Sequence, residues 1–448
     1  MTDITKKEAK KEEIPSPENV YHKRAGADAD LASQDGILYR WNGIYWAAQD
    51  VTEEESRAFA WLQTHYPSKV STPLAKHCAA AAVMGAQRLP CPKSKSQDAV
   101  LLPLRDQYLR ITKSGALMLT DPDKSAGLTY MVDAAFDPTA AAPLFHNFLE
   151  QVFMGDQDTM RWVQEYVGYS LLDDCRYQTA LFLVGSGANG KTTLAEIISR
   201  LHRRTVSMQL NNLRGFSLSP LIGASLVLVD ETPPRIDEQA LKSLISGGLC
   251  QIDRKFRDPV SFRPGAKWLV LGNVVPSISD QSHGFWRRMP VVPFKRQFST
   301  DEQDPSLTNK ITSTEMSGVL NWAVAGLVCL MQRGRFPAPS EAMVLAQSEC
   351  QKESNSVMSW WLDDRVEFNR DFETPRHVVY SDYKTWCGDN GMAALGVEKF
   401  WGRLKQIAGG EAVEPKPRKI QGKTVRVVPL RLLTESAGST KKVVMGRW

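Results

Sequence analysis

Apolar residues are spaced in different ways along the chain, and each change in spacing marks a change in the expected architecture. Between residues 36 and 120 they mostly alternate with polar residues, first around Asn42-Gly43 and again around 113–115. Alternation predicts strands with one buried face, and Asn-Gly between two such runs predicts a β-hairpin. Helical spacing predicts helices at about 52–66, 73–88, 142–153 and 158–172. We therefore expect an α+β domain over residues 31–155.

From residue 178 to residue 294 the apolar residues form short continuous runs instead. These runs are LFLV at 181–184, LVLV at 226–229, WLVLG at 268–272 and VVPF at 291–294. Continuous runs predict strands that are buried on both faces, which is typical of a parallel sheet covered by helices. A helical region at about 305–332 follows. We expect an α/β domain over residues 156–335.

A proline-containing joint at 336–339 precedes a third pattern. Val379, Tyr383 and Trp386 share one face of a first helix, and a second helix carries an apolar stripe of Val397, Phe400, Trp401, Leu404 and Ile407. Two short strands around 421–423 follow. This order predicts a small winged-helix domain over residues 336–434. Residues 1–30 and 435–448 have few large apolar side chains, so we expect a disordered tail and a basic tail there.

The formal net charge of +5 is distributed unevenly. Residues 400–448 carry eleven Lys and Arg against three Asp and Glu, whereas the rest of the chain has 44 basic and 47 acidic residues. A slightly acidic body with a strongly basic end makes a polyanion the first partner to consider. A basic face that serves only solubility is the alternative.

Cysteine usage and hydropathy bear on the compartment. The seven cysteines include no CxxC pair and no Cys/His cluster, which indicates reduced thiols rather than disulfides or a zinc site. The N-terminus has no apolar signal segment, and the longest apolar stretch, 316–331, is too short to span a bilayer. We expect a cytoplasmic protein with no membrane partner.

The segment after the run at 181–184 fits the phosphate-binding pattern GxxxxGK[ST]. An apolar strand leads into it and a helix-compatible stretch leads out, which is the setting that this motif requires. Backbone N–H groups and the helix N-terminus would bind the phosphates of ATP, with Lys191 reaching the β- and γ-phosphates and Thr192 holding Mg²⁺. We expect the nucleotide to be bound by Gly185, Ser186, Gly187, Ala188, Asn189, Gly190, Lys191, Thr192 and Thr193.

Polar residues end two of the later apolar runs. Asp230 and Glu231 follow the run at 226–229, and Asn273 follows the run at 268–272. The carboxyl ends of parallel strands border the ligand site in open α/β sheets. We therefore assign Asp230 to the Mg²⁺ shell and Glu231 to polarising the attacking water. Asn273 is expected to orient that water or to sense the γ-phosphate.

Basic residues in two segments are candidate contacts with phosphate or nucleic acid. Residues 251–263 predict a hairpin around 257–259 with a basic tip, for which Arg254, Lys255, Phe256 and Arg257 are the candidate contacts with single-stranded DNA. An edge hairpin whose charges discourage aggregation is the alternative. In the C-terminal domain we expect DNA contacts from Lys399, Arg403 and Lys423.

Taken in order, these motifs resemble the superfamily 3 helicases, and within them the helicase part of phage, plasmid and poxvirus primase-helicases. The residues that carry the resemblance are GSGANGKTTL at 185–194, LVLVDE at 226–231, the basic hairpin, KWLVLGN at 267–273, GFWRRMPVVPF at 284–294 and EMSGVLNWAVAG at 315–326. The resemblance is strong over 178–335 and weaker over 36–172. Many of these proteins also carry a zinc-type primase motif, and this sequence does not contain it.

This resemblance implies an AAA+-like core that assembles into a homo-oligomeric ring, a hexamer, with ATP at the subunit interfaces. It also implies translocation along single-stranded DNA and action on forked DNA, with a separate primase or replication protein as a possible partner. Arg287 or Arg288 would be the arginine finger that reaches the neighbouring site, and we favour Arg288. A solvated corner of the fold is the alternative for this pair.

We therefore expect an ATP-dependent replicative DNA helicase of a mobile element. A nucleotide-switched initiator or loader that remodels DNA without processive unwinding is the leading alternative. A structural ATP-binding protein without a nucleic-acid partner is a third.

Overall fold

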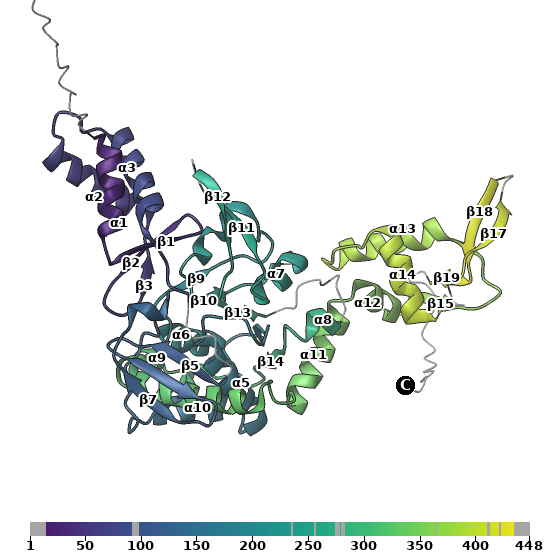
Figure 1. Cartoon of the computed structure of the whole chain (residues 1–448). Coiled ribbons are helices and arrows are strands. Elements are labelled where there is room, and N and C mark those ends of the chain that lie inside the picture. Colours follow the sequence, from purple (N-terminus) through teal and green to yellow (C-terminus); the bar gives the residue numbers. More distant parts are fainter. Residues whose placement is uncertain are drawn as a thin grey trace, which may run out of the picture.

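The structure is a computed structural model that describes residues 15–91, 98–233, 236–254, 257–273, 278, 283–363, 365–409, 413–420 and 423–433. Figure 1 shows a central body, a small N-terminal unit at one corner, and a C-terminal unit that begins with α11 beside the body and reaches away from it. The expected basic tail at 435–448 lies outside the described residues.

The N-terminal unit packs three helices on a small sheet. Its helices are α1 (Pro17–Ala27), α2 (Val51–His65) and α3 (Thr72–Gly85), and its strands, in the order β3-β2-β1-β4, are β1 (Leu31–Gln34), β2 (Ile37–Trp41), β3 (Trp46–Ala48) and β4 (Gln87–Arg88). The expected hairpin is confirmed, because Trp41 pairs with Trp46 across Asn42-Gly43.

The assignment of residues 17–27 to a disordered tail is wrong. Ser16 accepts a hydrogen bond from the Asn19 N–H and so caps α1, which buries Tyr21 and Ala25 against α2 and α3. The Tyr21 hydroxyl donates to the buried carboxylate of Glu54 at 2.9 Å. The helix has little amphipathic patterning of its own, and it is held in place by these tertiary contacts.

Residues 98–172 form a second sheet and two helices. The elements are β5 (Ala99–Pro103), β6 (Tyr108–Thr112) and β7 (Leu117–Thr120), joined as an antiparallel meander, the short helix η2 (Lys124–Ala126), α4 (Pro143–Val152) and α5 (Gln157–Ser170). Their apolar side chains share one hydrophobic core with the helix that follows the phosphate-binding motif. One continuous core therefore lies on both sides of residue 155, where we expected a domain boundary.

The central sheet has five parallel strands in the order β14-β8-β13-β10-β9. They are β8 (Leu181–Val184), β9 (Thr205–Ser207), β10 (Leu226–Val229), β13 (Lys267–Gly272) and β14 (Val291–Pro293). The four continuous apolar runs are thus strands of a parallel sheet, as expected. The helices of this region are α6 (Lys191–Arg200), η3 (Gly215–Leu221), α7 (Glu238–Ile245), α8 (His283–Trp286), η4 (Thr300–Glu302), α9 (Leu307–Thr314) and α10 (Met316–Arg333).

A two-stranded hairpin, β11 (Cys250–Arg254) and β12 (Arg257–Phe262), projects from this body beside the N-terminal unit (Figure 1). The hairpin is confirmed, but its turn is not at 257–259. Arg254 pairs with Arg257, so the residues after Arg254 connect the strands and Arg257 already belongs to β12.

The C-terminal unit contains α11 (Glu341–Glu353), α12 (Ser356–Leu362), α13 (Arg376–Asp389), α14 (Val397–Ala408), β15 (Val366–Phe368), β16 (Thr374–Pro375), β17 (Lys416–Ile420), β18 (Lys423–Val428) and β19 (Leu430–Leu432). The last strands form an antiparallel sheet of order β16-β18-β17, and β15 pairs with β19. The predicted faces of α13 and α14 lie in one core. Val397 is the exception, since it is 48% exposed.

Within the described ranges, no single helix is long and apolar enough to cross a membrane. The segments Thr300–Thr314 and Met316–Arg333 are long and apolar enough only when taken together, and they are bent by 78° at the break between them.

The main helix contact of the body is the packing of α10 on α5, and two glycines permit it. A Cβ atom at Gly168 would collide with the backbone of Ala323 and Leu327, and one at Gly326 would collide with the carbonyl of Gln164. The two helices therefore approach backbone to backbone, which a side chain at either position would prevent.

We predict that Gly326→Ala lowers the free energy of unfolding by about 1–3 kcal/mol, because the new methyl group forces the helices apart. Gly402→Ala is the matched control, since a Cβ atom there meets nothing within 4 Å on helix α14. Helix propensity alone should make that variant up to ~1 kcal/mol more stable. Urea denaturation measures both effects, and a stabilising Gly326→Ala would contradict the close approach of α5 and α10.

His202, just after α6, is buried between two serine hydroxyls. Its ring nitrogens lie 3.1 Å from Ser170 Oγ and 3.0 Å from Ser225 Oγ. Burial, with a smaller contribution from the charge of Lys267, lowers the pKa of His202 from 6.5 to about 3. The folded protein therefore keeps this imidazole neutral at pH values where an unfolded chain protonates it.

We predict that stability falls as the pH drops below about 6.5, because the unfolded state then binds a proton that the folded state does not. One such group changes the free energy of unfolding by at most about 1.4 kcal/mol per pH unit, over the interval down to about pH 3. Denaturation curves at several pH values should show a shallower dependence for His202→Gln. His22→Gln, at an exposed position, is the control, and an equal effect of both substitutions would contradict the assignment.

Candidate functional site

The segment between β8 and α6 forms a tight loop whose backbone surrounds an open space. Gly190, the residue before α6, has a φ of +86°, which a side chain would make unfavourable. At Gly185 the constraint is space, because a Cβ atom there would collide with Asn189 and with the backbone of Phe294. The N-terminus of α6 therefore faces this space with its first N–H groups free of side-chain caps.

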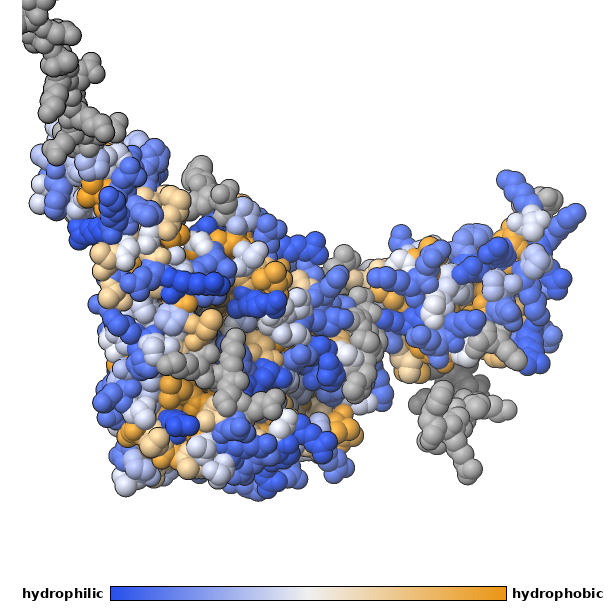
Figure 2. Space-filling model, in the orientation of Figure 1, coloured by the Kyte–Doolittle hydropathy of each residue, from blue (hydrophilic) through white to orange (hydrophobic). Residues whose placement is uncertain are grey.

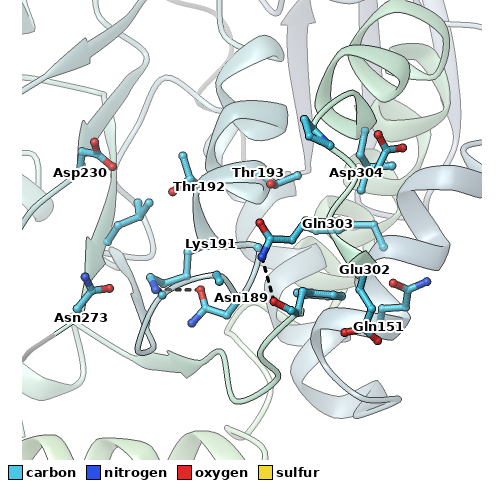
Figure 3. Close-up of a pocket in the computed structure, with 18 of the residues that line it drawn as sticks. Gln151, Asn189, Lys191, Thr192, Thr193, Asp230, Asn273, Glu302, Gln303 and Asp304 are labelled. Carbon is cyan, nitrogen blue, oxygen red and sulfur yellow. Dashed lines mark hydrogen bonds between the residues drawn. The ribbon is translucent and has the colours of Figure 1, made fainter. Parts of the chain in front are cut away.

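Lys191 is buried and its ammonium group is held inside the loop. Its Nζ atom donates to the carbonyl oxygen of Gly185 at 2.6 Å. It also donates to Asn189 Oδ1 at 3.0 Å (Figure 3). Burial lowers the pKa of Lys191. Both acceptors are neutral, and among the described residues no carboxylate pairs with Lys191, so its positive charge remains available to an anion.

A segment after β14 holds the loop in this shape. Phe294 donates its N–H to Val184 O at 2.7 Å, and Phe298 donates its N–H to Ala188 O at 2.9 Å. Side chains add two bonds, from Asn189 Nδ2 to Phe294 O at 3.2 Å and from Gln297 Nε2 to Ser186 Oγ at 2.7 Å. The loop is thus preformed by contacts with a distant part of the chain, which its own sequence does not reveal.

The two acids and the asparagine meet at the carboxyl edge of the sheet. Asp230 and Glu231 follow β10, Asn273 follows β13, and all three line the same cavity of about 1,090 Å³ as Lys191 and Thr192. Figure 3 shows Asp230 and Asn273 facing the loop from one side. The predicted residues of this site therefore come together, although their individual roles are not decided by this geometry.

Thr192 and Asp230 are the residues that fit a magnesium ion. Both are exposed to the cavity and present oxygen atoms, which Mg²⁺ prefers as ligands. Mg²⁺ commonly takes only one or two protein ligands and completes its shell with phosphate oxygens and water, so this small donor set is suitable.

The opposite wall of the cavity comes from parts of the chain in which the sequence indicated no site. Leu144, Asn147, Phe148 and Gln151 of α4 line it together with the segment from Phe298 to Leu307. This wall combines apolar surface with amide groups and the carboxylates of Glu302 and Asp304, which suits a nucleoside rather than a phosphate. Its polar residues on α4 are four positions apart, but that spacing is too common to identify a binding wall from sequence.

Helix α4 is positioned by a buried acid at the start of α10. Glu315 is 6% exposed and accepts hydrogen bonds from the N–H groups of Leu144 and Phe145, each at 3.0 Å. Ala142 at the cap position provides no side-chain bond, so Glu315 supplies the cap from 170 residues away. A carboxylate at a helix N-terminus is also favoured by the helix dipole.

The two tandem arginines differ in their surroundings. Arg288 donates from Nε to Ser246 Oγ at 3.0 Å, from Nη1 to Gly284 O at 2.6 Å and from Nη2 to Gln178 Oε1 at 3.1 Å. Arg287 is exposed and makes no hydrogen bond or ion pair with any residue in the described ranges. Arg288 is therefore engaged within its own subunit, contrary to our preference for it as the finger.

The expected nucleic-acid contacts are spread over two parts of the molecule. Arg254 is half-buried and donates to Gly36 O at 2.9 Å, which ties the hairpin to the N-terminal sheet. Lys255 and Phe256 lie outside the described residues, as does the side chain of Arg257. Lys399 on α14 and Lys423 at the start of β18 are exposed, and Arg403 is half-buried. These contacts stay predictions.

Residues 183–288 match a family model described as a family of unknown function, DUF5906. The matched segment begins in β8 and ends at Arg288. It therefore contains Lys191, Asp230, Glu231 and Asn273 but less than a quarter of the chain.

A stretch of the chain is weakly homologous to a viral protein. Over 157 residues it is 29% identical to a protein of Acanthamoeba polyphaga mimivirus named "Putative helicase L207/L206". The match covers 30% of this chain and only 16% of the viral protein. It is too short to assign the whole chain to a family.

Two solved structures have some likeness to this chain. "The A form apo structure of NrS-1 C terminal region-CTR" is 14% identical, with a TM-score of 0.39, and the match covers 74% of this chain and 96% of the other. "The A form apo structure of NrS-1 C terminal region-CTR(305-718)" is 12% identical, with a TM-score of 0.44, over 92% and 98% of the two chains. These TM-scores and sequence identities are too low to support a conclusion about function.

Proposed function

We propose that this protein is an ATP-dependent DNA helicase of the superfamily 3 type, with an AAA+-like ATPase core and a winged-helix C-terminal unit. The observation that carries the proposal is the single cavity in which Lys191 and Thr192 face Asp230, Glu231 and Asn273. The weak homology to a viral protein named as a helicase agrees with it.

The cavity groups have complementary tasks in phosphoryl transfer. Lys191 leaves its two neutral acceptors and binds phosphate oxygens, which stabilises the charge that develops on the transferring group. Glu231 accepts a proton from, or orients, the attacking water, and Asn273 holds that water in line. Bound at Thr192 and Asp230, Mg²⁺ would supply further charge neutralisation. The wall formed by α4 binds the nucleoside.

Arg287 is the better candidate for an arginine finger, because its side chain is exposed and bonds to none of the described residues, whereas that of Arg288 is held by three hydrogen bonds. A finger acts across a subunit interface, so this role requires a homo-oligomeric ring, for which a hexamer is the form that the resemblance implies. Arg288 then serves to fix the segment that presents Arg287.

DNA is the proposed second ligand. In this proposal, α12, α13 and α14 and the sheet of order β16-β18-β17 form a winged helix that binds DNA. The exposed Lys399 on α14 and Lys423 on the β17–β18 hairpin support it. The β11–β12 hairpin of each subunit would contact the single strand in the ring. A separate primase is a further proposed partner.

We predict that Lys191→Ala abolishes ATP turnover, and that Glu231→Gln still binds nucleotide but hydrolyses it about 100-fold more slowly or worse. Glu196→Gln is the control, since this acid lies on α6 but does not line the cavity. Steady-state ATPase and displacement of a strand from a forked duplex are measured together. ATP turnover without displacement would contradict the helicase and favour the loader.

We predict that Arg287→Ala keeps nucleotide binding but loses turnover by about 10³-fold, as expected for a finger. Mixing it with Lys191→Ala subunits should restore part of the activity, because each variant then completes the other's site. Arg288→Ala should instead lower the melting temperature. Wild-type turnover in a folded Arg287→Ala protein would show that this assignment is wrong.

A further inference from the structure

The C-terminal unit contains a second cavity, far along the chain from the nucleotide site. It is an open groove of about 590 Å³ between the first turns of α13 and α14 and strand β18, within the size range of small-molecule sites. We call it the α13–α14 groove. It is lined by Arg376, His377, Tyr380, Val397, Glu398, Trp401, Val425 and Arg426.

Apolar surface forms much of this groove. Val397 belongs to the apolar stripe of α14, yet it is 48% exposed because it faces the groove rather than the core. Tyr380 and Val425 are half-buried beside it. Figure 2 shows a C-terminal unit that is mostly hydrophilic on its surface and interrupted by smaller hydrophobic areas. Apolar lining of this kind would not contribute to the binding of a phosphate group alone.

A stacked arginine forms another part of the groove. The Arg376 guanidinium lies 4.4 Å from the centre of the Trp401 ring, which is itself 7% exposed. The Nε atom of Arg376 is buried and has no hydrogen-bond partner in the described part of the chain. Stacking on the indole, rather than hydrogen bonding, therefore holds this plane in position. Nucleic-acid bases stack on guanidinium planes of this kind.

Positive charge gathers at the same rim. The side chain of Arg426 is exposed and makes no hydrogen bond or ion pair with the described residues. Burial, followed by the nearby charge of Arg426, lowers the pKa of Arg376. The helices α13 and α14 begin here without side-chain caps, at Pro375 and Gly396. Glu398 is the acid that lines the groove, and it only partly offsets this charge. The rim suits an anion attached to a flat apolar group.

We infer that the α13–α14 groove seats one unpaired nucleotide of a DNA single strand, with its phosphate on Arg426 and its base on the Arg376–Trp401 stack. This inference rests on the proposed function and adds that the C-terminal unit binds DNA in its single-stranded form. A duplex offers phosphates but no free base face, so it cannot use the apolar part of the groove. A backbone phosphate of duplex DNA is the competing occupant.

The test compares binding of an oligothymidylate and of a blunt duplex to the full chain by fluorescence anisotropy at several salt concentrations. Arg376→Lys keeps the charge but removes the plane, so it should weaken single-strand binding about fivefold or more without changing the salt dependence. Arg426→Gln should weaken it and reduce the salt slope by about one phosphate contact. Duplex binding should change in neither variant.

Lys384→Gln is the control, because it removes one charge from α13 at an exposed position that does not line the groove. Thermal melting checks that each variant is folded. The inference is overturned if both groove variants bind the single strand with the same affinity as the control variant. It is also overturned if the groove variants lose as much affinity for the duplex as for the single strand. If the wild-type chain binds no DNA while turning over ATP, the DNA part of the proposed function fails as well.

Cross-linking locates the contact within the chain. A single strand that contains iodouracil should cross-link at Tyr380 or Trp401, the tyrosine and the tryptophan that line the groove, and Arg426→Gln should reduce that product. Glu398→Gln should increase it, since the substitution removes the acid that lines the groove. Cross-links confined to other parts of the chain would overturn the inference even if single-strand affinity were high.

Discussion

The pairing of β13 between β8 and β10 is the constraint on which the nucleotide cavity depends. Gly272 pairs with Val184 and Val270 pairs with Val229, so the three strands reach the same edge of the sheet in close register. The residues that follow them therefore emerge side by side, although they lie far apart in sequence. A slip of β13 by one residue would turn its side chains to the opposite face of the sheet and displace Asn273.

The cavity is also shaped from outside the sheet, and this explains how the phosphate-binding loop keeps a defined form. Backbone bonds from Phe294 and Phe298 hold the loop on one side, while α4 forms the opposite wall and is capped by Glu315 of α10. Preformed binding sites lose less entropy when a ligand arrives. The segment after β14 and the helical region after it thus serve the site as well as the core.

The same arrangement separates the two kinds of anion that the chain is proposed to bind. Lys191 is a buried cation whose hydrogen-bond acceptors in the described part of the chain are neutral, set in a body that is slightly acidic overall. The basic residues of the C-terminal unit lie on its surface, on α14 and the β17–β18 hairpin, with Arg376 and Arg426 at the rim of a groove. Buried charge favours a compact, highly charged ligand, and surface charge favours a long polyanion.

The sequence by itself determined the parallel sheet, the loop that ends at Lys191, the polar ends of β10 and β13, and the packed faces of α13 and α14. Each of these is a local pattern, in which burial or a backbone requirement restricts the residues within one element. Only the tertiary structure decided what depends on contacts between distant segments. The wall provided by α4, the cap from Glu315, the engagement of Arg288, the turn of the β11–β12 hairpin and the exposure of Val397 are of this kind. The periodicity within one segment does not indicate which other segment packs against it. For that reason the sequence of α1 predicted a tail, whereas in the structure the helix packs against α2 and α3.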